Sequence, residues 1–499
     1  MNKLYESTRS KNITSTASKA VLNGIANDGG LFVYRDLDKV NINIEELLKM
    51  DYYAIAKKVI GTMIDDFSED EINNCVNAAY TNKFSNHEIT PLVKVKNDYI
   101  LELFHGPTSA FKDVALSILP HLVTTALKTN NISDDIVILT ATSGDTGKAA
   151  LEGFKDVPKT KIIVFYPRDG VSVVQEKQMV TQEGNNTCVV SIDGNFDDAQ
   201  TGVKQIFTNN ELKAKLAKEN IQFSSANSIN IGRLVPQMVY YFASYVNLVN
   251  TKQIKLGEKV NFIVPTGNFG DILAGYYAKL LGLPVNKLVC ASNDNNVLYD
   301  FFKSGVYDRK RPFHKTMSPS MDILVSSNLE RLLYYISGCD NSYIDSLMKD
   351  LKEKGSYKVS SSMKAIMDEQ FYAGYCTNEE TSEIIKRVYN ESKYLLDPHT
   401  AVAYKVAEEF EASNASNGCK NVILATASPY KFSKNVYSAL YGEDEANALG
   451  NEFDIMRELN KRTNVDIPTN LSSLESKEVL HNNTINREQM EEFVISKVK

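Results

Sequence analysis

Three polar, glycine-containing loops follow predicted strands, and their residue types could bind anions or attack a carbonyl group. The first, VPTGNFGD, spans Val264–Asp271 and precedes a helix predicted over 272–282. Gly267 and Gly270 would let the backbone approach an anion closely, and the helix N-terminus would direct free N–H groups at it. This loop suits a phosphate held by few or no cations, although an ordinary β–α turn can have the same pattern.

The second loop, TATSGDTGK, spans 140–148 and offers hydroxyl groups, a carboxylate and a helix N-terminus. It resembles a P-loop, but only two residues separate Gly144 from Gly147, and Ala149 replaces the magnesium-binding Ser or Thr. The pattern therefore argues against a nucleoside triphosphate site. Its donors suit a ligand carboxylate, although a well-capped helix would use the same residue types.

The third loop, HGPTSAFKD, spans 105–113 and places Lys112 at the start of an apolar helix predicted over 114–127. A lysine that is desolvated near a helix N-terminus has a lowered pKa and becomes nucleophilic towards a carbonyl group. Most lysines are simply solvated, so this loop alone does not establish such a role.

Alternating strands and helices are predicted between about 100 and 295, and these elements must position the three loops. Five apolar runs rich in Val and Ile are predicted strands: 136–140, 161–166, 187–192, 260–264 and 287–291. Helical periodicity separates them, for example over 172–180 and 234–249, and one more strand, 422–424, lies far downstream. Continuous apolar strands that alternate with helices predict an α/β fold with parallel sheets covered on both faces.

Four parts of the chain are predicted from changes in this pattern. The predicted parts are an N-terminal domain over 1–95, a large α/β domain over 96–130 and 236–440, a small α/β domain over 131–235 and a C-terminal segment over 441–499. Within the large domain, residues 300–390 are mostly helical by periodicity and are interpreted as an insertion.

Composition excludes several classes of function. The 499 residues include 55 Lys and Arg against 62 Asp and Glu, a formal charge of −7, which gives no basic footprint for nucleic acid or an anionic membrane. Six dispersed cysteines without a CxxC pair are typical of a reducing compartment, and no residue set has metal-ligand spacing. Without a signal peptide or a long apolar run, a cytoplasmic protein is expected.

Together with the late strand, the three loops resemble pyridoxal-phosphate enzymes of fold type II and, within them, the threonine synthase family in its longer fungal and bacterial branch. The segments that carry the resemblance are DGGLF (28–32), HGPTSAFKD (105–113), SGDTG (143–147), NSINIGR (227–233), PTGNFGD (265–271), SPSMDILVSSNLERLL (318–333), DPHTA (397–401) and ATASPYKF (425–432). The resemblance implies pyridoxal 5′-phosphate as the cofactor and parallel sheets covered by helices, with an additional N-terminal domain and a helical insertion.

By motif position, the resemblance implies that Lys112 is the catalytic residue and forms the Schiff base with the cofactor. The implied cofactor-binding residues are Lys112, Asp145, Gly267, Asn268, Phe269, Gly270 and Thr426, with the Thr426 hydroxyl at the pyridine nitrogen. The implied substrate-binding residues are Ser143 and Thr146 for the carboxylate, and Ser228 and Arg233 for the phosphate. The chain departs from the family at Ser428, where members commonly have a histidine.

The implied reaction converts O-phospho-L-homoserine and water to L-threonine and phosphate, the last step of threonine biosynthesis, with Lys112 as general base and acid. A phospho-lyase that releases 2-oxobutyrate would use the same cofactor, and no single residue excludes it. A protein that binds the cofactor or an amino acid without turnover is a third alternative, against which the presence of Lys112 argues. The expected oligomeric state is a monomer or a homodimer.

Overall fold

A six-stranded sheet forms the centre of the larger part of the molecule. The computed structural model describes residues 4–142, 144–168 and 170–498. The strand order is β14-β11-β10-β15-β5-β4, and every neighbouring pair is parallel except β4 with β5. The bounds are β4 Leu92–Val95, β5 Asp98–Glu102, β10 Val260–Pro265, β11 Val285–Ser292, β14 Phe371–Tyr375 and β15 Lys420–Ala425.

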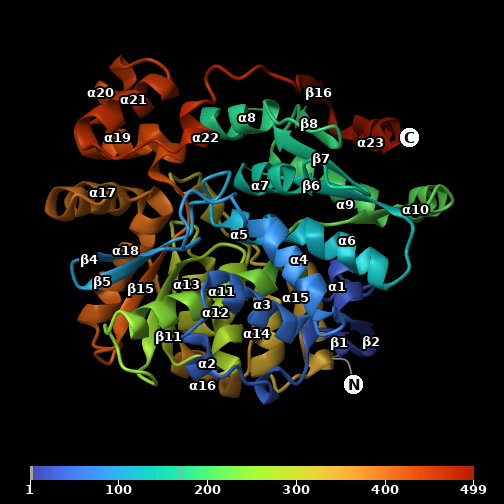
Figure 1. Cartoon of the computed structure of the whole chain (residues 1–499), viewed down its shortest axis with the longest axis horizontal. Coiled ribbons are helices and arrows are strands. Elements are labelled where there is room, and N and C mark those ends of the chain that lie inside the picture. The colour runs from blue at the N-terminus through green and yellow to red at the C-terminus, as the bar shows by residue number, and fades with distance from the viewer. Residues whose placement is uncertain (1–3, 143, 169, 499) are drawn as a thin grey trace.

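A second, fully parallel sheet lies above the first in Figure 1 and has the strand order β16-β8-β7-β6-β9. Its strands are β6 Asp135–Ala141, β7 Thr160–Pro167, β8 Thr187–Ile192, β9 Ile221–Ser224 and β16 Asn483–Ile485. The strand β16 comes from the C-terminal tail, whose last helix, α23 (Met490–Val498), packs against α9 (Phe196–Thr208). The tail therefore completes this sheet.

The N-terminal part contains a small antiparallel sheet, β2-β1-β3, with helices packed beside it. Its elements are β1 Leu4–Ser7, β2 Ser10–Thr16, α1 Ala17–Asn23, β3 Phe32–Tyr34, α2 Ile44–Leu47, α3 Tyr52–Met63 and α4 Glu69–Tyr80. The capping box of Ser68 and Glu71 begins α4, because each side chain accepts a hydrogen bond from the other's backbone N–H group.

Alternate residues of β10 face opposite sides of the six-stranded sheet, as the two-residue period of a strand requires. Phe262 and Val264 join the apolar cluster that contains α11 (Ile231–Asn250) and α12 (Gly270–Leu280). Ile263 joins the cluster that contains α18 (Pro398–Ala412). Because both faces are covered, the strand is apolar except at Asn261, which agrees with the predicted α/β class.

The segment 300–390 is mostly helical, as its periodicity predicts, but it also contributes strands. Its helices are α14 Leu329–Ile336, α15 Asn341–Glu353, α16 Ser361–Gln370 and α17 Asn378–Ser392, beside the antiparallel pair β12 (Val306–Asp308) and β13 (Ser356–Lys358). The short run Phe371–Tyr375 forms β14 at the edge of the main sheet, parallel to β11. Only the pairing with β11 identifies it as a strand, because five residues carry too little period for prediction.

The helix predicted over 114–127 is two helices, α5 (Lys112–Leu116) and α6 (Leu119–Thr129). Pro120 lies in the first turn of α6, where its missing N–H group is not needed. In a continuous helix its ring would clash with the carbonyl group of Leu116. The break leaves α5 short, and α5 lies between α7 (Asp145–Phe154) and α11 (Figure 1).

The carboxyl ends of β5, β10 and β15 lie at the same edge of the six-stranded sheet, since these strands are parallel neighbours. The three loops that leave this edge carry Lys112, the glycines of 267–270, and Thr426. Open α/β sheets bind ligands at this edge. Among the described residues, no helix is long and apolar enough to cross a membrane.

Candidate active site

Lys112 begins α5 and is buried, with 9% of its surface exposed. Its Nζ lies 3.4 Å from Ser320 Oγ and 3.5 Å from the Asp145 carboxylate, and 4.6 Å from the centre of the Phe111 ring. Burial lowers the pKa of Lys112; Asp145 opposes this, while the charges of Lys431 and Arg233 lower it further. The amine therefore has the environment that the sequence predicts for a nucleophile.

Asp145, at the first position of α7, lies between two lysines. Lys431 Nζ is 2.8 Å from its Oδ1 atom, which also accepts a 2.9 Å hydrogen bond from Gln175 Nε2. Ser320 Oγ donates to Oδ2 at 3.3 Å. Burial raises the pKa of Asp145, but the two lysines outweigh it and hold the pKa well below its usual range. Asp145 is therefore a permanent carboxylate beside Lys112.

The loop between β10 and α12 has the backbone geometry of an anion site. Phe269 precedes the helix in the left-handed conformation, with φ 62°, and no side chain caps the helix N-terminus. A Cβ atom on Gly267 would lie 2.7 Å from the carbonyl oxygen of Ser320, whereas one on Gly270 would meet nothing closer than 3.5 Å. The uncapped N–H groups of α12 are free for a phosphate.

Arg233 and Ser228 lie at the N-terminus of α11, beside this loop. A Cβ atom on Gly270 would lie 3.6 Å from Ser228 Cβ, and Asn328 Nδ2 donates both to Ser228 Oγ (3.3 Å) and to the Asn268 carbonyl oxygen (3.1 Å). Asn230 caps α11 by accepting from the Gly232 N–H group at 2.8 Å. The structure therefore brings the second predicted anion site next to the first.

The Arg233 guanidinium is buried, with 2% of its surface exposed, and its Nη1 donates to the Ala226 carbonyl oxygen at 2.6 Å. Its Nε has no hydrogen-bond partner among the described residues, and no carboxylate is among the groups that influence it. Burial lowers the pKa of Arg233 to about 10, so it remains a cation at neutral pH. Burying a cation without a charged partner costs free energy, which an anionic ligand would offset.

Thr426 follows β15 and is buried, and its backbone carbonyl oxygen accepts from the Phe111 N–H group at 2.8 Å. Two residues on, the Ser428 N–H group donates to the Ser109 carbonyl oxygen at 3.1 Å. These bonds join the lysine loop to the loop after β15. Ser428 Oγ accepts from the Tyr430 N–H group at 3.3 Å and caps the short helix Pro429–Phe432. The residue that departs from the family therefore stabilises a turn in this chain.

The loop between β6 and α7 is only partly described, because Ser143 lies outside the described residues. Thr146 is half-buried in the first turn of α7. The Thr142 hydroxyl accepts hydrogen bonds from the N–H groups of Gly144 (3.0 Å) and Gly147 (2.9 Å). The Thr142 hydroxyl therefore caps the N-terminus of α7. The Asp145 side chain, in the first turn, faces Lys112.

His399, in DPHTA, positions the site without facing the lysine directly. Asp397 caps α18 by accepting from the His399 N–H group, and it also holds His399 Nδ1 at 2.8 Å. The opposite ring nitrogen, Nε2, accepts from the Ser320 N–H group at 3.2 Å. The histidine therefore fixes the turn that presents the Ser320 hydroxyl to Lys112 and Asp145.

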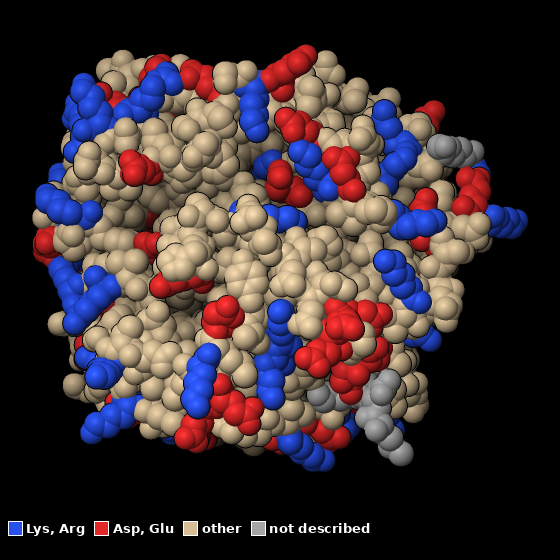
Figure 2. All heavy atoms as spheres, in the orientation of Figure 1, with Lys and Arg blue, Asp and Glu red and all other residues tan. Residues whose placement is uncertain are grey.

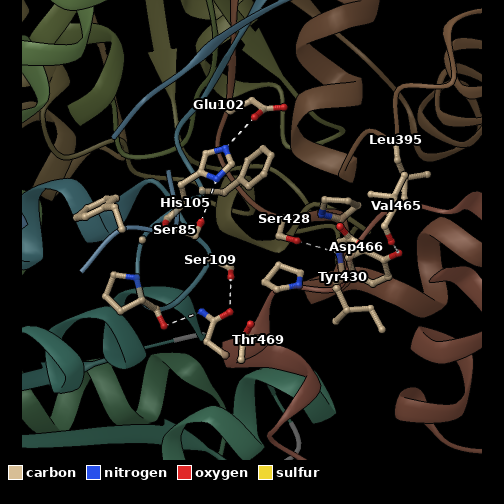
Figure 3. A pocket seen from close by; sticks show the side chains of 18 of the residues that line it. Ser85, Glu102, His105, Ser109, Leu395, Ser428, Tyr430, Val465, Asp466 and Thr469 are labelled. Atoms are coloured by element: carbon tan, nitrogen blue, oxygen red, sulfur yellow. Dashed lines mark hydrogen bonds and ion pairs between the residues drawn. The ribbon is translucent and has the colours of Figure 1, made fainter. Parts of the chain in front are cut away.

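A cavity of about 690 Å³ lies beside the lysine loop (Figure 3). Its walls include His105 and Ser109 of that loop, Ser428, and Val465 of the C-terminal segment. His105 Nε2 contacts Glu102 at 2.8 Å and Nδ1 contacts the Ser85 hydroxyl at 3.2 Å. The residues that line the cavity do not include Lys112, Asp145, Arg233 or the glycine loop, so the cavity is separate from the site described above.

Two residues of the site were not assigned a role from the sequence, Lys431 and Ser320. Both lie inside motif segments, in ATASPYKF and SPSMD, but Asp145 is 286 positions from Lys431, and Lys112 is 208 positions from Ser320. A lysine within the apolar run PYKF, at the end of a buried strand, was the available signal for Lys431.

The residues of the site fit pyridoxal phosphate. An uncapped helix N-terminus and a glycine loop suit its phosphate group, and the buried Lys112 amine suits its carbonyl carbon. Thr426 is buried at the third strand end and offers a neutral hydroxyl group. Within the described part of the chain, no cluster of His, Cys, Asp and Glu could hold a metal ion.

Comparison with known families agrees with this assignment along most of the chain. Residues 84–427 match the family model described as pyridoxal-phosphate dependent enzyme. Residues 4–80 match threonine synthase N terminus, and residues 400–479 match threonine synthase, C-terminal. Threonine synthase of Saccharomyces cerevisiae is 37% identical over 470 residues, which cover 88% of this chain and 90% of the yeast protein. That of Pseudomonas aeruginosa is 36% identical over 445 residues.

Solved structures show the same similarity in three dimensions. Threonine synthase from Brucella melitensis, solved with pyridoxal phosphate bound, has a TM-score of 0.87 and 36% identity and covers 99% of both chains. The yeast enzyme has a TM-score of 0.88 and 34% identity, covering 100% of this chain and 99% of its own. These matches confirm the predicted fold type and cofactor, and the chain belongs to the threonine synthase family of pyridoxal-phosphate-dependent enzymes.

Proposed function

We propose that this chain converts O-phospho-L-homoserine and water to L-threonine and phosphate. The observation that carries the proposal is the pair of adjacent anion sites beside the buried Lys112 amine. One is the uncharged glycine loop, and the other is the unpaired Arg233 guanidinium. A cofactor phosphate and a substrate phosphate together need two such sites, whereas a cofactor enzyme acting on an unphosphorylated amino acid needs only one.

The assignment of residues to ligands follows from their positions. Residues 267–270 would hold the cofactor phosphate, Lys112 would bond to its carbonyl carbon, and the Thr426 hydroxyl would face its ring nitrogen. Ser228 and Arg233 would bind the substrate phosphate, while Ser143, Thr146 and the N-terminus of α7 would bind the substrate carboxylate. Asp145, fixed by Lys431, would lie beside the bond between Lys112 and the cofactor.

When bound, pyridoxal phosphate supplies an electron sink that stabilises negative charge on the amino-acid carbons. Lys112 would be the group placed to move protons at Cα and Cβ of the substrate, because burial favours its neutral amine, which can act as a base. Arg233 neutralises charge on the γ-phosphate as this group leaves. Lys112, Arg233 and Thr426 are buried, which keeps bulk water from these side chains.

The reaction is tested by incubating the purified holoenzyme with O-phospho-L-homoserine and measuring phosphate, threonine and 2-oxobutyrate in the same tube. Equal amounts of threonine and phosphate are expected. Phosphate with 2-oxobutyrate would instead identify a phospho-lyase, and cofactor binding without any phosphate release would identify a protein without turnover.

We propose a cytoplasmic monomer or homodimer that binds no nucleic acid; the six unpaired cysteines suit a reducing compartment, and Lys and Arg are interspersed with Asp and Glu over the face in Figure 2. We also propose the domain division 1–95, 96–130 with 236–440, 131–235, and 441–499, which the separate sheets support, although β4 pairs within the large sheet.

The two loop glycines are expected to differ in their tolerance of a side chain. Gly267→Ala should reduce cofactor occupancy after dialysis severalfold, because its Cβ would lie 2.7 Å from the Ser320 carbonyl oxygen and displace the loop. Gly270→Ala is the matched control, and with 3.5 Å of space it should keep most of its cofactor. Visible absorbance per mole of protein measures occupancy. Full occupancy in both variants would place the cofactor phosphate elsewhere.

Thr426→Asp should keep the cofactor but change its electronic properties. A carboxylate at this buried position would favour a protonated ring nitrogen, which strengthens the electron sink. We expect a shifted absorption maximum and more α-elimination or transamination products, quantified against threonine by chromatography. Thr426→Ser, which keeps the hydroxyl group, is the control. An unchanged product ratio in Thr426→Asp would remove Thr426 from the ring nitrogen.

A further inference from the structure

A second lysine, Lys431, is part of the same buried charge cluster as Lys112. It is fully buried, with 0% of its surface exposed, and its Nζ donates to the Thr108 carbonyl oxygen at 3.0 Å. Its one carboxylate partner among the described residues is Asp145, at 2.8 Å. A buried lysine needs such a partner, because burying an uncompensated ammonium group is costly.

Asp145 is shared unequally between the two lysines. Its Oδ1 is held by Lys431 and by Gln175, while Oδ2 faces Lys112 at 3.5 Å and Ser320 at 3.3 Å. The contact with Lys431 has the length of a charge-assisted hydrogen bond, whereas the contact with Lys112 is longer than one. Lys431 therefore neutralises most of the negative charge with which Asp145 would otherwise stabilise the protonated form of Lys112.

The remaining groups around Lys112 do not replace Lys431. Arg233 on α11 is a cation, and its charge acts on Lys112 in the same direction. Burial raises the pKa values of Asp113 and Asp271 to about 6, and both are held by hydroxyl groups, of Thr108 in one case and of two tyrosines in the other. His399 reaches Lys112 only through Ser320.

We propose that Lys431 is a positioning residue for the proposed reaction: by neutralising Asp145, it prevents this carboxylate from holding the Lys112 amine as an ammonium ion. Without Lys431, an unpaired carboxylate 3.5 Å from Lys112 would favour its protonated form, which is neither a nucleophile nor a base. A cation placed near a catalytic lysine is a known way of keeping that lysine reactive. The proposal rests on the role of Lys112 given under the proposed function.

The test is the pH dependence of the visible absorbance of the holoenzyme, which reports protonation of the covalent linkage at Lys112. Lys431→Met should move the midpoint upward by about one to three pH units, since an opposite charge at this distance has that effect. Asp145→Asn should move it downward, because two cations then act without the carboxylate. The double variant Lys431→Met/Asp145→Asn removes both charges and should return the midpoint towards that of the unsubstituted enzyme.

Lys148→Met is the matched control, because Lys148 is also buried but pairs with Glu152, about two turns along α7 from Asp145. It should leave the midpoint unchanged. If Lys431 only holds the Thr108 carbonyl group, Lys431→Met will lower the melting temperature without moving the midpoint, and the proposal fails. It also fails if the double variant has the same raised midpoint as Lys431→Met alone, because the shift would then not depend on Asp145.

A second measurement needs no cofactor, so it can also be made on a variant that binds the cofactor poorly. In the full-length chain freed of cofactor, the rate at which acetic anhydride modifies Lys112, measured by mass spectrometry across pH, reports the same protonation. The unsubstituted chain, Lys431→Met, Asp145→Asn and the double variant should have their midpoints in the same order as in the holoenzyme. An identical pH profile in these four proteins overturns the proposal. Borohydride treatment of the unsubstituted holoenzyme separates the two hypotheses: failure to attach the cofactor to Lys112 refutes the proposed function instead.

Discussion

Lys112→Ala should lose turnover of O-phospho-L-homoserine by at least about three orders of magnitude, because one amine serves as both the covalent attachment point and the proton carrier. The cofactor should still bind through the glycine loop, since that site does not use the lysine. Borohydride should fix the cofactor to the unsubstituted enzyme at Lys112 and leave the variant unlabelled. Peptide mass spectrometry after reduction identifies the attachment point.

A matched buried lysine shows whether the loss is specific. Lys148 lies on α7, with its Nζ 3.0 Å from Glu152, and is as buried as Lys112. Lys148→Ala should destabilise the fold, because it leaves a carboxylate without its partner, but the folded fraction should turn over normally. Activity in Lys112→Ala without an added amine, above that of the reagent blank, would contradict the assignment of Lys112.

β10 and β15, beside the Lys112 loop, could be predicted from the sequence because each contains an apolar run that is buried on both faces, but β5, the strand that this loop leaves, was not among the predicted strands. β10 reads VNFIVP, and all of its residues are buried. Its sequence pattern and its burial in the structure therefore both indicate a strand covered on both faces. The break between α5 and α6 was missed even though Pro120 signals it, since the apolar pattern continues through 114–127. β14 was missed because only its pairing with β11 makes it a strand.

The loops of the candidate site could be identified from the sequence, but the charges inside it could not be paired. Lys431 meets Asp145, and Ser320 meets Lys112, only after two sheets and three loops have been assembled. No local pattern encodes a contact between residues so far apart in the chain. The burial of Arg233 could not be predicted either, because a guanidinium is expected to be solvated unless the fold buries it.

Arg233→Met should separate catalysis from stability. We expect a loss of about 2–4 kcal/mol in transition-state stabilisation, seen as a fall of roughly 30-fold to 1000-fold in kcat/KM for O-phospho-L-homoserine. Arg233→Lys should also lose activity, because a point charge replaces a planar fork that can hold two phosphate oxygens. Binding of an amino acid without a phosphate group, followed by the change in visible absorbance, should be nearly unaffected.

The same substitution should leave the ligand-free fold at least as stable as before. Arg233 is 2% exposed, has no carboxylate partner and leaves Nε without a hydrogen bond in the described structure, so its charge costs free energy until an anion binds. Methionine fills similar volume and removes that cost, at the expense of one hydrogen bond to Ala226 worth about 1 kcal/mol. Thermal melts without phosphate should therefore show an equal or higher melting temperature for Arg233→Met.

Inorganic phosphate then distinguishes a ligand site from a structural one. A ligand that binds only the folded state stabilises it in proportion to the logarithm of its concentration, so phosphate should raise the melting temperature of the unsubstituted holoenzyme. In Arg233→Met this increase should be much smaller, while the cofactor stays bound. A variant that melts lower, and loses cofactor and substrate binding to the same extent, would show that Arg233 supports the fold and that other residues bind the substrate phosphate. If Arg233 instead binds the substrate phosphate, Arg233→Met should melt at an equal or higher temperature without phosphate. The reason is that the free energy that burial of the guanidinium costs is recovered only when the phosphate is present.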